Sequence, residues 1–118
     1  MQTDEQNQRQ PVRFAGLQMP VTQQIEENKQ TILDSLDWCK DNKVNWLLTP
    51  EGSLTGYFPN VDLVAPQGVT GIQSAATEIV AKAQGLGIGI ALGTLWVDVE
   101  HRGAIRKNQI RYYDPEGL

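Results

Sequence analysis

The hydrophobic residues of this chain follow two different spacings that alternate along the sequence. Apolar runs typical of strands occupy 12–19, 44–49 and 88–97, and a further strand is expected through 110–113. Between these runs, apolar residues recur at helical spacing, first at Ile25, Ile32, Leu33, Leu36 and Cys39, then at Ile72, Ala75, Ala76, Ile79, Val80 and Ala83. The order strand–helix–strand–helix–strand–strand predicts an α/β fold: a layered β-sheet with helices on one face.

Turn and capping residues indicate where these elements end. Pro20 ends the first strand, because proline cannot donate a ladder hydrogen bond. Thr70 and Gln73 have the spacing of a capping box, which predicts that the second helix begins at Thr70. Residues 51–70 then form one long loop, of a length that is usually functional or disordered. The nearly continuous apolar run 88–97 predicts a strand that is covered on both faces.

We interpret the chain as one partial domain behind a polar tail. Residues 1–10 are too polar to hold themselves against a core, so we expect a disordered tail there and the folded domain over 11–118. Residues 114–117, Asp-Pro-Glu-Gly, are a turn signal that normally leads into another strand. We therefore expect the chain to end within a hairpin.

Composition and charge exclude several classes of function. The formal net charge of -4 and the scattered Lys and Arg residues give no basic surface for nucleic acid or an anionic membrane. No apolar run approaches the roughly 18 residues that span a bilayer. One histidine and one cysteine disfavour a metal site, and the single cysteine, which cannot form an internal disulfide, fits a reducing cytoplasm. We expect a cytoplasmic protein without metal or cofactor.

The most informative segment is Pro50-Glu51-Gly52-Ser53-Leu54-Thr55-Gly56-Tyr57, directly after the second predicted strand. In open α/β sheets, catalytic and binding groups gather beyond the carboxyl ends of the strands, where Glu51 is placed. The segment closely resembles the catalytic glutamate motif of the nitrilase superfamily, the carbon–nitrogen hydrolases. Weaker similarities to that family occur before the segment, at Asn28, and after it, at 90–94 and at Asn108. Their order along the chain is the order expected for the family.

This resemblance covers 12–117 and implies one half of an αββα sandwich that acts on amides or nitriles. In such enzymes a cysteine thiolate attacks the substrate carbon, a glutamate takes the thiol proton and later activates water, and a lysine stabilises the developing charge. By resemblance Glu51 is the catalytic base. Tyr57 is a candidate for the substrate pocket, and an equally weighted alternative is that it only packs the loop against the core.

The resemblance assigns no residue of this chain to the lysine or the cysteine. Lys107 stands too early in register, and Cys39 lies on the apolar stripe of the first helix, where a small buried hydrophobe is expected. We therefore expect an N-terminal portion of a carbon–nitrogen hydrolase that is inactive by itself. The alternative is a non-catalytic α/β oligomerisation or small-molecule-binding domain derived from that fold. Half a sandwich leaves apolar sheet surface uncovered, so a homo-oligomer or a complementary second half is the expected partner.

Overall fold

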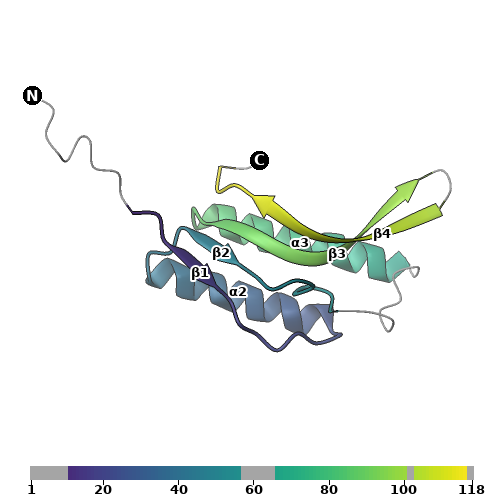
Figure 1. Cartoon of the computed structure of the whole chain (residues 1–118), viewed down its shortest axis with the longest axis horizontal. Helices are drawn as coiled ribbons and strands as arrows, with labels where there is room; N and C mark the ends of the chain where they lie inside the picture. The colour runs from purple at the N-terminus through teal and green to yellow at the C-terminus, as the bar shows by residue number, and fades with distance from the viewer. Residues whose placement is uncertain (1–10, 57–65, 101–102, 117–118) are drawn as a thin grey trace, which may run out of the picture.

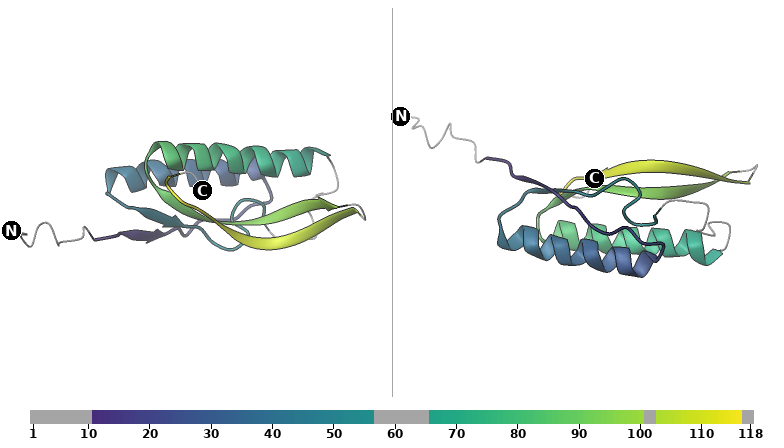
Figure 2. Two further views of the ribbon diagram at one scale, coloured as in Figure 1. Left: turned by 90° about the horizontal axis from the view of Figure 1, so that it is seen from above. Right: turned by 60° about the horizontal axis from the view of Figure 1, so that its bottom comes forward.

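The computed structural model describes residues 11–56, 66–100 and 103–116 (Figure 1). The predicted tail, residues 1–10, lies outside the described residues. Within the described ranges, the elements in chain order are β1 (Phe14–Gly16), α2 (Ile25–Asp41), β2 (Trp46–Leu48), α3 (Pro66–Gly85), β3 (Gly89–Glu100) and β4 (Gly103–Tyr113). This order confirms the predicted alternation of strands and helices. Figure 2 shows that α2 and α3 lie side by side against the same face of the sheet.

The four strands form one sheet in the order β1-β2-β3-β4. β1, β2 and β3 run parallel, with Leu47 of β2 paired to Ala15 on one side and Ile90 on the other. Each parallel step is made through a helix, and right-handed crossovers place both helices on the same face. β3 and β4 are antiparallel and form a long hairpin that extends beyond the short strands (Figure 1).

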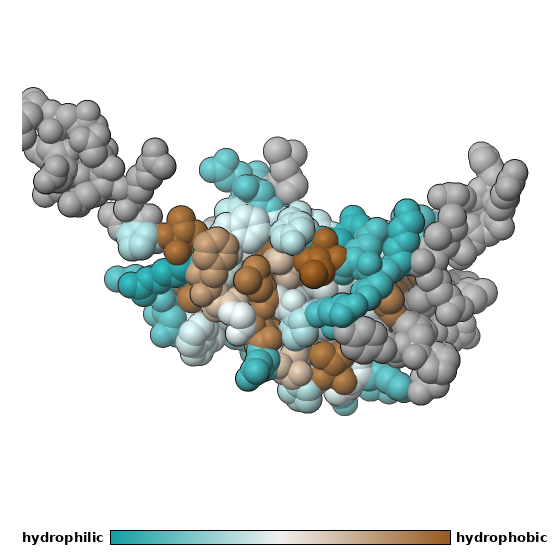
Figure 3. All heavy atoms as spheres, viewed as in Figure 1, coloured by the Kyte–Doolittle hydropathy of each residue, from teal (hydrophilic) through white to brown (hydrophobic). Residues whose placement is uncertain are grey.

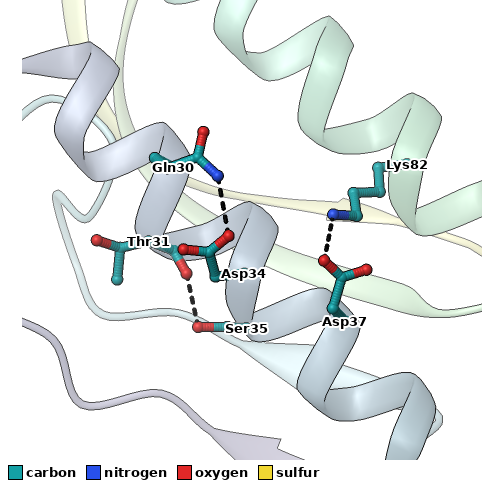
Figure 4. A network of polar contacts seen from close by, with 6 residues as sticks. All are labelled: Gln30, Thr31, Asp34, Ser35, Asp37 and Lys82. Carbon is teal, nitrogen blue, oxygen red and sulfur yellow. Dashed lines mark hydrogen bonds and ion pairs between the residues drawn. The ribbon is translucent and has the colours of Figure 1, made fainter.

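The hydrophobic core lies between the helix layer and the sheet. Leu47, Ile90 and Leu92 face the helices and pack in one cluster with Ile32, Leu36 and Cys39 of α2 and Ala75, Ala76, Ile79 and Ala83 of α3. On their outer surfaces the helices are also joined by an ion pair, in which Lys82 Nζ lies 2.7 Å from Asp37 Oδ2 (Figure 4). Exposed ion pairs contribute little, so burial of the apolar face holds this layer in place.

The predicted start of the second helix is wrong, and the difference has a local cause. Helix α3 begins at Pro66 rather than at the proposed capping box of Thr70 and Gln73. Proline is favoured in the first turn of a helix, where its missing N–H has no helical partner to lose. The helix stops at Gly85, and Gly87 follows in the left-handed region with φ 71°.

β1 and β2 are shorter than the apolar runs 12–19 and 44–49 predicted. At the start of these strands the side chain of Asn45 replaces a ladder bond, because its Oδ1 accepts from Arg13 N at 2.7 Å. After Thr49 the chain turns away at Pro50, which ends β2. β3 is longer than predicted, since it continues to Glu100. Residues 88–95 and Val97 are buried, and successive residues of a strand point to opposite faces. This burial confirms the prediction of a strand that is covered on both faces.

No helix in the described ranges is both long enough and apolar enough to cross a membrane.

Candidate functional site

The segment around Glu51 forms a tight turn directly beyond the carboxyl end of β2. Ser53 N donates to Pro50 O at 3.1 Å, and Gly56 N donates to Gly52 O at 2.7 Å. Gly52 and Gly56 have φ angles of 66° and 74°, a region that glycine adopts without strain. Glu51 itself is exposed at this end of the sheet, where the sequence placed it.

Buried hydroxyl groups attach this turn to β3. Thr55 Oγ1 accepts from Leu95 N at 3.0 Å, and Thr49 Oγ1 accepts from Gly93 N at 2.9 Å. The Ser53 hydroxyl lies 2.8 Å from Gly93 O, which also accepts from Leu54 N at 3.1 Å. Thr49, Ser53 and Thr55 are all buried, and each has a hydrogen-bond partner. The turn thereby continues the hydrogen bonding of β2 alongside β3 after the strand itself has ended.

Gly93 allows the turn to approach β3 this closely. A Cβ atom at this position would stand 2.0 Å from Pro50 O and 3.0 Å from Glu51 Cα. Both neighbours are backbone atoms, so the clash could be relieved only by moving the turn. Gly93 therefore sets the distance between the backbone of Glu51 and the sheet.

Asn28 of α2 holds the turn from the helix side. Its Nδ2 donates to Leu54 O at 3.0 Å and to Thr22 O at 2.8 Å. Its Oδ1 accepts from Thr22 N at 3.0 Å and from the Thr22 hydroxyl at 3.1 Å. With its side chain 1% exposed, this asparagine uses both N–H donors and both acceptor positions. It ties together the start of α2, the segment before it and the Glu51 turn.

The Glu51 carboxylate contacts a residue from the far end of the chain. The side-chain amide of Asn108, on β4, donates a hydrogen bond to Glu51 Oε1. Asn108 stands opposite Leu95 in the β3–β4 ladder, beside the strand to which the turn is attached. The carboxylate is therefore oriented by a donor from β4 while its backbone is held by β3 and α2.

Two other candidate residues, Cys39 and Lys107, lie within the described part of the chain. Cys39 is fully buried in the core, and this burial raises the pKa of its thiol, which disfavours the reactive thiolate. Lys107 Nζ lies 2.9 Å from Asp98 Oδ2 within the hairpin. Tyr57 lies outside the described residues. Within the described ranges, no group of three or more His, Cys, Asp or Glu side chains is placed to hold a metal ion.

Sequence reasoning missed the residues that support Glu51. Thr49, Ser53 and Thr55 are small polar residues in a turn, a pattern that normally indicates exposed loop. The two-residue spacing of Ser53 and Thr55 was the available signal, since it is also the spacing of one strand face. Asn108 was noted only for its resemblance to a family pattern, and nothing local to it pointed to Glu51.

Comparison with solved structures identifies the fold. An amidase from Nesterenkonia sp. superposes with a TM-score of 0.62 at 20% sequence identity, covering 87% of this chain and 42% of the amidase. A mutant of the Nesterenkonia AN1 amidase, described as from the nitrilase superfamily, gives the same TM-score, identity and coverage. A double mutant of the Nesterenkonia sp. AN1 amidase in complex with acrylamide matches at 19% identity with a TM-score of 0.62, again covering 87% and 42%. Comparisons with protein-family models and with curated proteins give no match.

These matches agree with the architecture built up above from the sheet and its two covering helices. The chain spans less than half the length of the amidases that it matches. The fold of this chain is therefore the fold that makes up part of these amidases.

Proposed function

We propose that this chain is the glutamate-bearing part of a carbon–nitrogen hydrolase of the amidase type, with Glu51 as the general base. The observation that carries the proposal is the placement of Glu51 at the carboxyl end of β2, on a turn attached to β3 and α2, with its carboxylate held by Asn108. A general base must be held within reach of the proton that it takes, and a carboxylate fixed in this way supports that role. The motif resemblance and the shared fold with amidases support the same role.

In the proposed reaction, Glu51 takes the proton of a cysteine thiol as the sulfur attacks the carbonyl carbon of an amide. The C–N bond then breaks as Glu51 gives this proton to the leaving amine, and an acyl thioester remains. Glu51 next takes a proton from water, whose oxygen attacks the thioester and releases the carboxylic acid and the thiol. A lysine stabilises the negative charge on the carbonyl oxygen during both attacks.

The cysteine and the lysine of this scheme must come from outside the 118 residues. Cys39 is the sole cysteine of the sequence, and its sulfur is enclosed in the core. Lys107 is engaged with Asp98 on the hairpin. We therefore propose that the chain by itself does not hydrolyse amides or nitriles. We also propose that Tyr57, at the end of the motif, lines the completed substrate pocket.

The partner is proposed to lie on the open face of the sheet. This face, defined by Phe14, Leu48, Ile110 and Tyr112, points away from the helices and exposes 63, 39, 49 and 69% of these side chains respectively. Figure 3, viewed from this side, shows apolar residues gathered over the middle of the sheet. Exposed apolar surface of this kind is typical of an interface. A complementary second half, or for the isolated chain a second copy, is the proposed occupant.

The proposed function is tested by measuring ammonia release from simple amides and nitriles, with the purified chain and its Glu51→Gln variant side by side. We expect no turnover from either protein. Turnover that is lost in the variant would contradict the proposed dependence on an outside cysteine. Sequencing the source DNA past the codon for Leu118 completes the test: a following strand with a lysine, then a cysteine in a strand-to-helix turn, is the expected result.

A non-catalytic binding or oligomerisation domain is the second candidate function. The observation that favours it is the burial of Cys39, which leaves the described fold without an accessible thiol. A stop codon directly after Leu118 would favour this alternative. Under both functions, a free buried thiol without a disulfide partner in the sequence fits the proposed cytoplasmic location.

A further inference from the structure

A second site lies on the opposite side of the sheet from the open face. A pocket of about 310 Å³ separates the later part of α3 from the β3–β4 hairpin. Its sheet wall consists of Trp96, Arg111 and Tyr113, and its helix wall is made mainly of small side chains such as Ala76 and Ala81. The volume is at the lower end of the range for small-molecule sites, which is roughly 300–1,000 Å³.

Arg111 is held in a fixed orientation at this pocket by three contacts. Its guanidinium carbon lies 3.9 Å from the centroid of the Trp96 ring. Its Nε donates to Tyr113 Oη at 2.7 Å, and one Nη1 hydrogen is donated to Gln109 Oε1 at 2.7 Å. Since a guanidinium has five N–H donors, one on Nη1 and two on Nη2 remain after these two bonds. They lie on the outer edge of the fork, which suits the two oxygens of one carboxylate.

The charge of Arg111 has no carboxylate partner among the described residues. Lys29, Lys82 and Lys107 each form an ion pair with an acidic side chain, whereas no ion pair of the described ranges includes Arg111. A half-buried cation without an opposite charge, oriented on an aromatic ring, is a ready site for an anion.

The residues that line the pocket around Arg111 favour a ligand with one negative charge and a planar or short apolar part. Trp96 and Tyr113 supply aromatic surface, and the helix wall supplies alanine and valine methyl groups. Gln84, another lining residue, belongs to the last turn of α3, where the helix carries partial negative charge. This end of a helix opposes any anion, and it opposes a phosphate dianion more strongly than a singly charged carboxylate. We propose that the pocket between α3 and β4 binds a small aromatic or short aliphatic monocarboxylate, with Arg111 as the anchor and Trp96 as the platform.

The proposal is tested with sodium benzoate as the probe, using ¹⁵N NMR spectra of the purified chain at fixed pH and ionic strength. We expect saturable shifts of the Trp96 indole N–H and the Arg111 Nε–H. Benzamide, which has the same shape without the charge, should bind at least about tenfold more weakly, because the charge-assisted bonds are lost. Inorganic phosphate should also bind more weakly than benzoate.

Variants test whether benzoate binds in this pocket or elsewhere on the surface. Arg111→Gln should weaken benzoate binding by about tenfold or more, while Arg13→Gln, at an exposed arginine outside the pocket, should leave it within about twofold. Because Arg111→Gln also removes contacts of the fold, Ala81→Phe provides a second route. Ala81 is exposed, so the added ring fills the pocket without entering the core, and Ser74→Phe on the same helix is its matched control.

Equal binding of benzamide and benzoate would overturn the proposal, and so would unchanged benzoate binding in Ala81→Phe. Shifts that do not saturate, or that are spread evenly over the surface, would also overturn it. These measurements do not depend on amide hydrolysis. A failure of benzoate binding would therefore contradict the proposed site without contradicting the proposed function.

Discussion

At the scale of single residues, the support of the Glu51 turn depends on polar side chains that are buried with all their hydrogen bonds made. Asn28 is the clearest case, because its amide serves two separate segments at once. A buried donor or acceptor that loses its partner costs more than a formed hydrogen bond contributes. Residues of this kind therefore define one arrangement of the turn and exclude looser ones.

We expect Asn28→Ala to lower the free energy of unfolding by about 2–4 kcal/mol, because it leaves Leu54 O and the backbone of Thr22 without their partner. Urea unfolding followed by circular dichroism measures the change. Asn42→Ala is the matched control, since the Asn42 amide bonds to Trp38 O at an exposed helix end and should cost about 1 kcal/mol or less. Equal losses for the two variants would contradict the role given to Asn28.

Cys39 is expected to be unreactive in the folded chain. Burial raises the pKa of its thiol above the ordinary value of 9.0, so the folded state holds the neutral form. The associated stability is complete below that ordinary pKa, and it is lost as the pH rises toward the folded-state pKa, because only the unfolded chain gains from ionising. A thiol reagent at pH 8 should label Cys39 only after denaturant is added. Rapid labelling of the native chain would contradict its enclosure in the core.

At the scale of elements, the contact between the Glu51 turn and β3 is the feature that positions the candidate site. β2 ends after Leu48, yet the chain stays beside β3 because Thr49, Ser53 and Thr55 supply the hydrogen bonds that a continued strand would make. Gly93 is required for this, since any larger residue would push Pro50 away from the strand. β3, the Glu51 turn and Gly93 therefore together determine where Glu51 lies.

We expect Gly93→Ala to displace the turn, and to lower the free energy of unfolding by about 1–3 kcal/mol through overpacking against backbone. The NMR signal of the Asn108 side-chain amide should shift in this variant, because its contact with Glu51 is disturbed. Gly16→Ala in β1 is the control, because no atom lies within 4 Å of a Cβ there. An unshifted Asn108 amide would show that Gly93 does not set the position of Glu51.

At the scale of the whole molecule, the two faces of the sheet differ in their exposure to solvent. One face is closed by α2 and α3 around a continuous core, and the other presents Phe14, Leu48, Ile110 and Tyr112 to solvent. Burying such side chains is favourable by about 25 cal/mol per Å² of apolar surface removed from water. In a solution of the purified chain, the surface available for this is the open face of another copy.

The isolated chain is therefore expected to self-associate at micromolar concentration, as measured by light scattering after size-exclusion chromatography. Tyr112→Asp should shift the population toward the monomer, because burying an unpaired carboxylate opposes association. Trp38→Asp is the control, since Trp38 is similarly exposed, at 55%, but belongs to the helix layer. A monodisperse monomer of the unmodified chain would contradict the proposed interface.

The sequence by itself determined the elements and their order, together with the position of Glu51 after a strand. Hydrophobic spacing, Pro50 and Gly87 act over a few residues, so they can be interpreted locally. The start of α3 was predicted wrongly because two local signals, Pro66 and the Thr70–Gln73 spacing, competed within the same few residues.

Only the tertiary structure decided which residues meet. Asn28 reaches Leu54, Asn108 reaches Glu51, and Arg111 faces α3 because the crossovers and the hairpin bring distant segments together. The burial of Thr49, Ser53 and Thr55 depends on the same packing, against a strand some 40 residues further along the chain. Local patterns encode the strands and helices, whereas the hydrogen bonds that hold the candidate site form only once the sheet has assembled.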